Sequence, residues 1–185
     1  SDGTNSTTQD ITVSINNLND NSPIFTSGSS FSADENQSSI NTVVSSDADG
    51  DDVTYSISGS EIAIDSSSGV ITFISEPDYE TKTSYTATVT SSDGASNSST
   101  QDITVSINNL NDNSPIFTSD ATFSAAENQT AIGTAAGTDA DGDSISFSVS
   151  GSELAITSAG VLTFGSAPNY ETKNSYTATV TANDG

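Results

Sequence analysis

The sequence predicts an all-β protein made of tandem seven-stranded Greek-key β-sandwiches, and three observations lead to that prediction. The chain repeats itself, because Asn16–Phe25 returns letter for letter as Asn108–Phe117. Short stretches alternate apolar and polar residues with the period of two that is typical of half-buried strands. Turn pairs such as Asp49-Gly50 separate these stretches, and no apolar pattern keeps helical spacing for more than one turn.

The repeat sets the domain organisation. Its period is 92 residues, the separation of Asn19 from Asn111, and a one-residue deletion near Ser158 shortens it by one afterwards. A module of this length is large enough to fold as a small domain. We expect three parts: the last strand of a preceding repeat plus its linker at 1–21, a first repeat at 22–113, and a second repeat, lacking its last strand, at 114–185.

Seven strands are expected in the first repeat. The clearest is the sixth, where Tyr85, Ala87 and Val89 alternate with threonines that suit the outward face of a sheet. The same alternation over residues 11–15 predicts a strand in the N-terminal part. Seven short strands patterned on both faces favour a sandwich. The expected strands lie near 23–34, 39–46, 52–58, 61–65, 69–75, 83–91 and 98–108.

Composition restricts the partners. Two Lys and Arg residues stand against 25 Asp and Glu, which gives a formal net charge of −23, and the chain contains no His, Cys, Met or Trp. Such a chain repels nucleic acid and anionic membrane surfaces, so its natural partner is a cation. The low apolar content, 31%, leaves disorder as an alternative. The regular alternation of apolar residues argues against it.

No catalytic site is expected. Without His or Cys, the usual triads and thiol chemistry are excluded. Paired carboxylates that hydrolyse glycosides need an aromatic sugar cleft, which a chain with 6% aromatic residues does not suggest. Lys82 and Lys173 both occur in "YETK", where an exposed solubilising lysine is favoured over a crosslink to asparagine. The chain is therefore expected not to be an enzyme.

The acidic residues avoid the strand centres and gather at strand ends. They occur in Ala33–Asn36 ("ADEN"), Asp47–Asp51 ("DADGD") and Pro77–Glu80 ("PDYE"), and each motif returns in the second repeat in the same or a closely related form. Strands of a sandwich run alternately up and down, so these loops sort to the two poles of each module. Carboxylates gathered in this way repel one another unless a hard cation such as Ca²⁺, which takes about 6–8 oxygen ligands, neutralises them.

Each motif has a plainer explanation when it is taken alone. Asn-Asp-Asn before proline is commonly a turn, and acidic residues at strand ends can simply protect a sheet edge. "DADGD" is not an EF-hand loop, because Gly50 is its fourth residue and an EF-hand has glycine at the sixth. The joint order of the motifs, found twice, favours a cation site over these explanations.

These residues resemble a known family. "LNDNSPIF" resembles the linker between cadherin repeats, "DEN" and "AEN" its glutamate motif at the module base, "DAD" its Asp-x-Asp, and "DYET" its acidic-x-Glu motif. The serine- and threonine-rich composition of the chain is similar to that of the cadherin-like tandem repeats of large bacterial surface adhesins. The resemblance implies sandwiches joined to neighbouring repeats through Ca²⁺, forming a stiff extracellular rod at the cell surface that serves adhesion. The alternative is a module that itself binds a polysaccharide or a partner sandwich.

The resemblance also implies the ligands of about three Ca²⁺ ions at the complete junction, each with about 6–8 oxygens. They are Glu35, Asp78, Glu80, the Leu110 carbonyl, Asn111, Asp112, the Asn113 carbonyl, Asp139, Asp141 and Asp184. The corresponding residues of a second junction are Asn19, Asp20, Asn21, Asp47, Asp49, Asp93, Glu127 and Glu171. Asn169 replaces the aspartate that would match Asp78, which removes one charge there. The loop after Asp141 is also shorter than in animal cadherins.

The two ends of the sequence suggest an exchange of strands. Residues 1–17 match the seventh strand of a module that is otherwise absent, and the second repeat stops before its own seventh strand. We expect residues 1–17 of one chain to complete the second repeat of another, by strand addition. A head-to-tail contact of this kind does not close, so it produces linear chains. A frayed, incomplete second repeat is the alternative.

Overall fold

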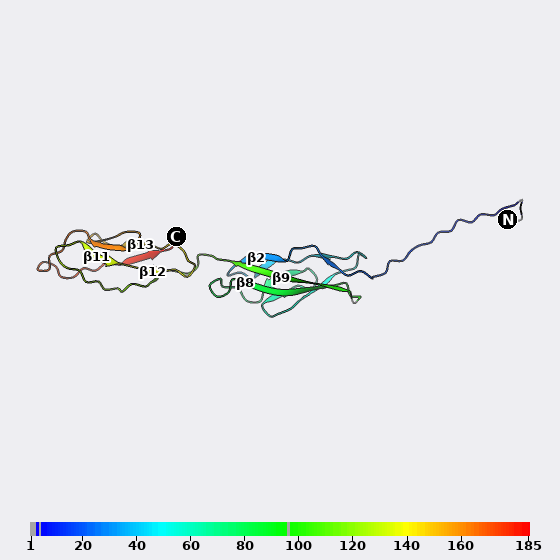
Figure 1. Ribbon diagram of the computed structural model, residues 1–185, viewed down its shortest axis with the longest axis horizontal. Helices are drawn as coiled ribbons and strands as arrows, with labels where there is room; N and C mark the ends of the chain where they lie inside the picture. The colour runs from blue at the N-terminus through cyan, green and yellow to red at the C-terminus, as the bar shows by residue number, and fades with distance from the viewer. Residues whose placement is uncertain (1–2, 4, 96) are drawn as a thin grey trace. The chain divides into compact units, whose positions relative to one another are not determined.

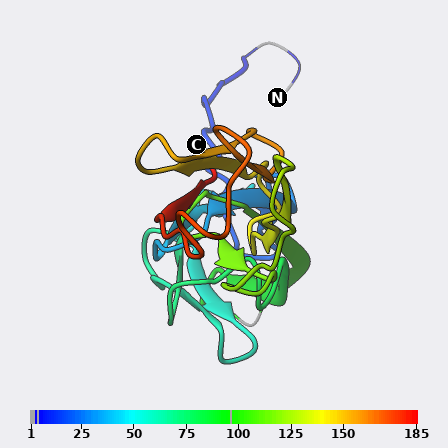
Figure 2. The ribbon, with the colours of Figure 1, turned by 90° about the vertical axis from the view of Figure 1, so that its left-hand side faces the viewer.

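The computed structural model describes residues 3, 5–95 and 97–185, which divide into two compact units. Unit 1 comprises Ser1–Pro77 and Ser84–Ser106, and unit 2 comprises Asp78–Thr83 and Ile107–Gly185. Both ribbon views show strands and loops without a helix in this part of the chain, so the prediction of an all-β protein is confirmed (Figures 1 and 2). Over the same residues, no helix is long and apolar enough to cross a membrane.

Unit 1 contains two sheets and one short strand pair. The four-stranded sheet has the order β2 (Ser30–Asp34), β9 (Ser98–Asn108), β8 (Ser84–Ser92) and β5 (Thr54–Ile57). The three-stranded sheet has the order β3 (Ser39–Thr42), β7 (Val70–Phe73) and β6 (Ile62–Ile64). β1 (Ile24–Phe25) pairs with β4 (Ser45–Ser46). β9 thus lies between β2 and β8, as Figure 1 shows.

The seven strands expected in the first repeat all appear, and two of them are divided. Residues 23–34 form β1 and then β2, and residues 39–46 form β3 and then β4. The division follows from a change of partner: β1 pairs with β4, whereas β2 joins β9 and β3 joins β7. A pattern of alternating residues does not reveal such a change, because the side-chain period is the same in either ladder.

The core of unit 1 comes from the inward positions of both sheets. Val43, Ile71, Val89 and Val105 are completely buried. Along β9, buried residues alternate with exposed ones, as the period of two requires. Phe73 and Tyr85 add an edge-to-face aromatic contact, with ring centroids 5.0 Å apart. The alternation of apolar residues therefore marks the core correctly here.

Unit 2 repeats only part of this arrangement. β10 (Ile116–Phe117) pairs with β12 (Gly137–Thr138), and β11 (Ala131–Thr134), β15 (Val161–Phe164) and β14 (Leu154–Ile156) form a three-stranded sheet. In place of a four-stranded sheet, the described residues of unit 2 form the pair β13 (Ser146–Val149) and β16 (Val180–Asn183). β16 has 4 residues, where its counterpart β8 has 9.

The N-terminal segment is not part of any sheet of the described chain. The alternation of Ile11, Val13 and Ile15 predicts a strand, but none of these residues is paired into a sheet, and all three side chains are exposed. A β-ladder requires a partner strand, and no described strand pairs with this segment. Within the described chain this segment is therefore unpaired, and its expected role as the last strand of a preceding repeat stays a prediction.

Candidate metal centre

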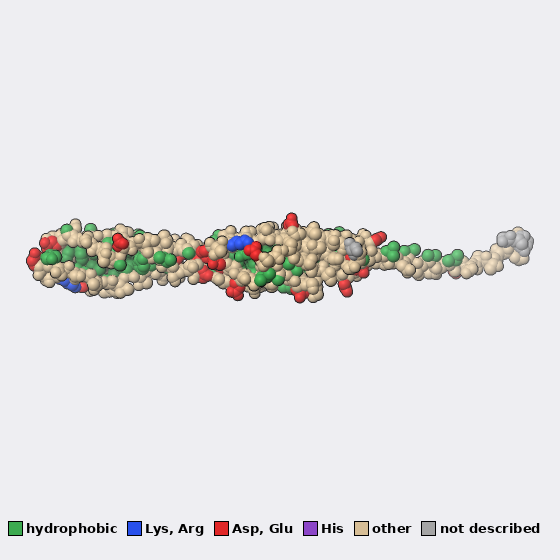
Figure 3. Space-filling view, turned by 90° about the horizontal axis from the view of Figure 1, so that it is seen from below, with side chains coloured by type: hydrophobic (Ala, Val, Ile, Leu, Met, Phe, Trp, Pro, Cys, Tyr) green, Lys and Arg blue, Asp and Glu red, His purple; other side chains and the backbone are tan. Residues whose placement is uncertain are grey.

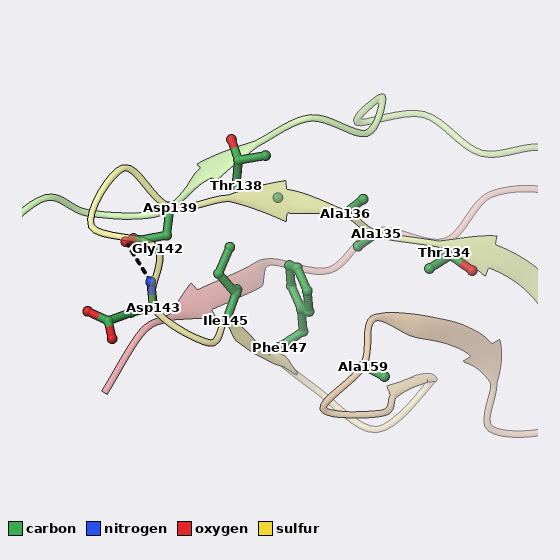
Figure 4. Close-up of a pocket in the computed structure, with 11 residues that line it drawn as sticks. Thr134, Ala135, Ala136, Thr138, Asp139, Gly142, Asp143, Ile145, Phe147 and Ala159 are labelled. Atoms are coloured by element: carbon green, nitrogen blue, oxygen red, sulfur yellow. Dashed lines mark hydrogen bonds between the residues drawn. The ribbon is translucent and has the colours of Figure 1, made fainter. Parts of the chain in front are cut away.

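The "DADGD" loop of unit 2 brings three carboxylates together. Asp139, Asp141 and Asp143 follow β12, and each offers a carboxylate oxygen within 4.8 Å of the others. Gly142 has a φ of +83°, a left-handed turn conformation that glycine adopts without steric cost. The turn lets the backbone N–H of Asp141 donate to Asp139 Oδ1 at 3.0 Å. The backbone N–H of Asp143 donates to the same oxygen at 3.4 Å, as Figure 4 shows.

The linker is tied to this loop through Asp141. The backbone N–H groups of Asp112 and Asn113 donate to Asp141 Oδ2, at 3.1 and 2.8 Å. Asn113 Nδ2 donates to the other oxygen, Oδ1, at 2.9 Å. The side-chain hydrogen bond from Asn113 is the main reason that the pKa of Asp141 lies below its usual value, and the two backbone donors add to it. Asp141 is therefore a carboxylate ion at neutral pH, held by the linker.

Glu80 belongs to the same group of oxygens in unit 2. Carboxylate oxygens of Glu80, Asp112 and Asp141 all lie within 4.8 Å of one another. Asn113 Nδ2 joins them, because it donates to Glu80 Oε2 at 3.3 Å and to Asp112 Oδ1 at 2.8 Å. A turn, the linker and the loop after β12 each contribute one carboxylate. The structure brings these three residues together, and their role as metal ligands stays a prediction.

The same arrangement occurs in unit 1. The backbone N–H groups of Asp20 and Asn21 donate to Asp49 Oδ2, at 2.9 and 2.8 Å, and Asn21 Nδ2 donates to Asp49 Oδ1 at 2.9 Å. The backbone donor of Asn21 is the main cause that lowers the pKa of Asp49. Oxygens of Asp47, Asp49 and Asp51 also lie within 4.8 Å of one another. The linker motif thus has one structural role in both units.

Asp93 and Asn19 lie at this same end of unit 1. Asn97 Nδ2 donates to Asn19 Oδ1 at 2.8 Å and to Asp93 Oδ2 at 2.9 Å. Burial raises the pKa of Asp93, but hydrogen bonds from Ala95 and Asn97 outweigh it, so that the pKa lies below the usual value. Sequence reasoning missed Asn97, because its role depends on a contact across the fold.

Two further contacts were also missed from the sequence. Asn17 Nδ2 donates to the Asp49 carbonyl at 2.8 Å, and Asn109 Nδ2 donates to the Asp141 carbonyl at 2.7 Å.

Asp51 and Asp143 had not been assigned as ligands either, although the spacing of three aspartates at every second residue was visible in the sequence. In Asp51, desolvation and then the negative charges of Asp47, Asp49, Asp93 and Asp52 raise the pKa.

One oxygen in each loop indicates what the loops can bind. Asp47 Oδ2 and Asp139 Oδ2 are buried and have no hydrogen-bond partner. The other oxygens of these carboxylates accept the backbone N–H of Asp49 and Asp141, at 2.8 and 3.0 Å. A buried carboxylate oxygen without a donor is costly, and a hard cation satisfies it directly. The donor set, which consists of carboxylate, amide and carbonyl oxygens, fits Ca²⁺.

Glu35 and Glu127 occupy equivalent loops in the two units. Glu35 is buried, with 2% of its surface exposed. The next residue, Asn36, has a φ of +60°, which asparagine tolerates, and its N–H donates to the Pro77 carbonyl at 2.9 Å. In unit 2, Glu127 Oε2 accepts the backbone N–H of Tyr170 at 3.0 Å. In each unit, the loop that holds the glutamate motif is therefore hydrogen-bonded to the segment at the acidic-x-Glu motif.

Asp78 and Asn169 occupy equivalent turns in the two repeats. Asp78 Oδ1 accepts the N–H of Thr81 at 3.0 Å, and Asn169 Oδ1 accepts that of Thr172 at 3.1 Å, so both act as turn acceptors. Leu110 is 40% exposed. Other predicted ligands belong to none of the acidic groups found among the described residues: Asp184, Asp93, Glu127 and Glu171.

Lys173 lies outside these groups. Its Nζ pairs with Glu153 at 2.6 Å and stands 4.5 Å from the centre of the Tyr176 ring. The side chain is 43% exposed, which agrees with the interpretation of an exposed lysine.

Comparisons with known proteins point to one relationship. Residues 19–106 match the bacterial Ig domain family. Protocadherin Fat 4 of Mus musculus is 34% identical over 147 residues, which cover 70% of this chain and 3% of that protein. Cadherin EGF LAG seven-pass G-type receptor 2 of Homo sapiens is 32% identical over 132 residues, which cover 65% of this chain and 4% of that protein. The chain thus spans a few per cent of the length of these relatives.

Solved structures show the same fold. The structure of human protocadherin-24 EC1-2 matches with a TM-score of 0.74 and 20% identity, over 90% of this chain and 94% of that chain. Mouse cadherin-23 EC22-24 matches with a TM-score of 0.71 and 24% identity, over 91% of this chain and 61% of that chain. Cadherin-like and bacterial Ig domains are structural, non-enzymatic domains that are typical of extracellular surface proteins. The chain therefore has the fold of cadherin repeats and is similar in sequence to cadherin-type proteins, and residues 19–106 match the bacterial Ig domain family.

Proposed function

We propose that the chain is a calcium-binding structural segment of an extracellular cell-surface adhesin, in which Ca²⁺ at the module boundaries stiffens a rod. In this proposal the modules are residues 22–113 and 114–185. The relationship to cadherin repeats supports an adhesive structural role. The observation that carries the calcium proposal is the buried carboxylate oxygen without a donor, which occurs at Asp47 and again at Asp139.

The proposed ligands of the complete junction start from the oxygens of Glu80, Asp112, Asp141 and Asp139. Two of these groups share Asp141, which would let it bridge two ions. Asp143 joins the set, because its carboxylate lies in the same group as Asp139 and Asp141. The rest of the set extends to Glu35, Asp78, Asn111, Asp184 and the carbonyls of Leu110 and Asn113.

The residue types favour calcium over other metals. Zinc and copper sites use His or Cys, and the sequence contains neither. Mg²⁺ demands near-ideal octahedral geometry and keeps several waters, so it is usually held by one or two carboxylates. Calcium accepts a larger and more flexible set of oxygens, and the loops here offer several carboxylates each.

Calorimetric titration of the chelator-treated full chain with CaCl₂ tests the proposal. Asp141→Asn removes one ligand charge in unit 2, Asp49→Asn removes its counterpart in unit 1, and Asp120→Asn removes an exposed charge outside the acidic groups. We expect more than one Ca²⁺ per chain. Asp141→Asn should weaken one class of sites by about tenfold or more, equivalent to about 1.4 kcal/mol, and leave the Asp49 class unchanged.

Two results would count against the proposal. One is the absence of binding heat together with no retention of Ca²⁺ in equilibrium dialysis at millimolar concentration. The other is an equal loss of affinity in Asp120→Asn and Asp141→Asn, which would mean that only the overall negative charge attracts calcium.

A further inference from the structure

Unit 2 contains a hollow beside its acidic loop. Its volume is about 470 Å³, which is within the range of about 300–1,000 Å³ for small-molecule sites. It is lined by residues of β11, β12 and β13, by the loop between β12 and β13, and by Ala159 before β15. Figure 4 shows Ile145 and Phe147 projecting into it from one side, with the loop of Asp139 and Asp143 at one end. The hollow thus has apolar walls and an acidic end.

The backbone around this hollow follows the same hydrogen-bond pattern in the two units. The N–H of Tyr55 donates to the Ser66 carbonyl at 2.9 Å, and the N–H of Phe147 donates to the Ser158 carbonyl at 3.2 Å. In both units the strand before this place leads into the same acidic sequence, Asp-Ala-Asp-Gly-Asp. Differences between the units at this place therefore come from their side chains.

Unit 1 places hydroxyl groups here that unit 2 lacks. The N–H and the Oγ of Ser45 both donate to the Tyr55 hydroxyl, at 2.8 and 3.0 Å. Gly137 and Phe147 take the equivalent positions in unit 2, and neither carries a hydroxyl. Phe147 therefore cannot accept the N–H of Gly137 in the way that the Tyr55 hydroxyl accepts that of Ser45.

Small side chains keep the hollow open. Two valines of unit 1, at positions 43 and 44, are replaced by Ala135 and Ala136 in unit 2. A Cβ on Gly137 would lie 3.0 Å from the Ile116 carbonyl oxygen and 3.4 Å from Ile145 Cδ1, so a larger residue there would crowd both. The substitutions that open the hollow thus lie close together in the sequence, within a repeat that otherwise resembles unit 1 closely.

We propose that the hollow of unit 2 binds a neutral pyranose sugar through two neighbouring hydroxyl groups. One hydroxyl takes the place of the Tyr55 hydroxyl and accepts the N–H of Gly137. The next donates to Asp139 Oδ2, a buried oxygen to which no described group donates. The apolar face of the sugar ring lies against Phe147. The inference goes beyond the proposed structural role, and the binding needs no calcium.

The charges of the chain favour a neutral ligand. A net charge of −23 repels anionic sugars, and no Lys or Arg is among the described residues that line the hollow. On the face that Figure 3 shows, basic side chains appear only as two small areas, and most of the surface is uncharged. A hydroxyl-rich ligand suits a site with a backbone donor, a carboxylate acceptor and an aromatic ring, because a few polar groups then fix its orientation.

NMR titration of the full chain with the methyl glycosides of glucose, mannose and galactose tests the inference. The titration is done in excess chelator, because Asp139 is also a proposed calcium ligand. We expect at least one glycoside to shift the amide signals of residues 137–147, with a dissociation constant in the millimolar range. The equivalent residues 45–55 of unit 1 should not respond, because Ser45 and Tyr55 already supply the hydroxyls there.

Variants that copy unit 1 provide the control. The triple variant Gly137→Ser, Ile145→Val and Phe147→Tyr restores the hydroxyl pair of unit 1 and should weaken glycoside binding by about tenfold or more. Asp139→Asn, which can place a donor beside the ligand hydroxyl, should weaken it as well. Thr130→Ser also introduces a unit 1 residue, but at an exposed position outside the hollow, and should bind as the parent chain does.

Several outcomes would overturn the proposal. One is a chain whose amides respond to none of the glycosides at tens of millimolar. Another is an equal shift of residues 45–55, which would show contact with acidic loops in general. Binding that both the triple variant and Asp139→Asn retain, or a response to n-butylamine without one to the glycosides, would overturn it too. Failure of the calcium titration leaves this inference standing, and failure of the glycoside titration leaves the calcium proposal standing.

Discussion

Asp65 shows how one carboxylate organises a turn in this chain. Its Oδ1 accepts the backbone N–H groups of Ser67 and Ser68, at 3.1 and 2.8 Å, together with both serine hydroxyls. These hydrogen bonds hold the pKa of Asp65 well below its ordinary value of 3.8. A carboxyl whose pKa is lower in the folded state stabilises that state when it is ionised. The stabilisation is complete above the ordinary pKa and is lost as the pH falls through the lowered one.

The first prediction concerns Asp65→Thr, which introduces the residue that unit 2 has at the equivalent position, Thr157. The variant should be less stable near neutral pH and should lose less of its stability between about pH 4 and pH 2, because the titrating group is absent. NMR titration of the Asp65 carboxyl carbon, with acid unfolding of both chains, measures this. A midpoint near 3.8 for Asp65 would contradict the hydrogen bonding described here.

The second prediction compares two glycines. Gly69 has a φ of +72°, and a Cβ on it would lie 2.2 Å from the Val43 carbonyl oxygen, whereas Gly59 has a φ of +92° and nothing within 4 Å. Gly59→Ala should cost about 1–2 kcal/mol of unfolding free energy, from the left-handed conformation alone. Gly69→Ala should cost about a further 1–3 kcal/mol, because a backbone atom must move. Urea unfolding measures both, and equal losses would refute the close approach.

At the scale of elements, a comparison of β9 with the N-terminal segment separates the effects of local sequence and of burial on the free energy of unfolding. Val105 and Val13 have the same neighbours in the sequence, but only Val105 is buried. Val105→Ala should lower the unfolding free energy of unit 1 by about 2 kcal/mol, since it removes buried apolar groups and leaves a cavity. Val13→Ala should change it by less than about 0.5 kcal/mol in dilute solution. Similar losses in the two variants would mean that residues 5–17 are packed in the monomer.

The alternation of residues predicted the strands of unit 1 because it reports which side chains face a core. It did not predict that residues 23–34 and 39–46 each form two strands, because a change of partner leaves the alternation intact. It also predicted a strand around Val13 that has no partner, since a pattern shows the capacity to pair and not the presence of a neighbour. Tertiary context decides both points.

The candidate site was predictable in part for a similar reason. The linker and the Asp141 loop could be expected at the same end of the module, because their motifs recur in a fixed order along the sequence. Asn97 and Asn109 act through single contacts across loops, and no motif marks them. Asp143 was visible as a third aspartate in its loop, but its place in the group depends on the turn at Gly142.

At the scale of the whole molecule, the net charge of −23 is concentrated in part at the loops where linkers meet modules. Without a counter-ion, these carboxylates repel one another, and added monovalent salt only screens them over a Debye length of about 8 Å at physiological ionic strength. A bound Ca²⁺ would neutralise them and also fix the ligands that the linker supplies. The central claim is that calcium makes residues 110–115 stiff.

Small-angle X-ray scattering of the full chain, in excess chelator and then in millimolar CaCl₂, tests this claim most directly. Asp112→Asn and Asp120→Asn are compared with the parent chain at low protein concentration. We predict that calcium makes the distance distribution longer and narrower, that Asp112→Asn keeps the profile of the chelated chain, and that Asp120→Asn responds as its parent does. A profile that is unchanged by calcium, or an Asp112→Asn chain that stiffens like its parent, would contradict the account.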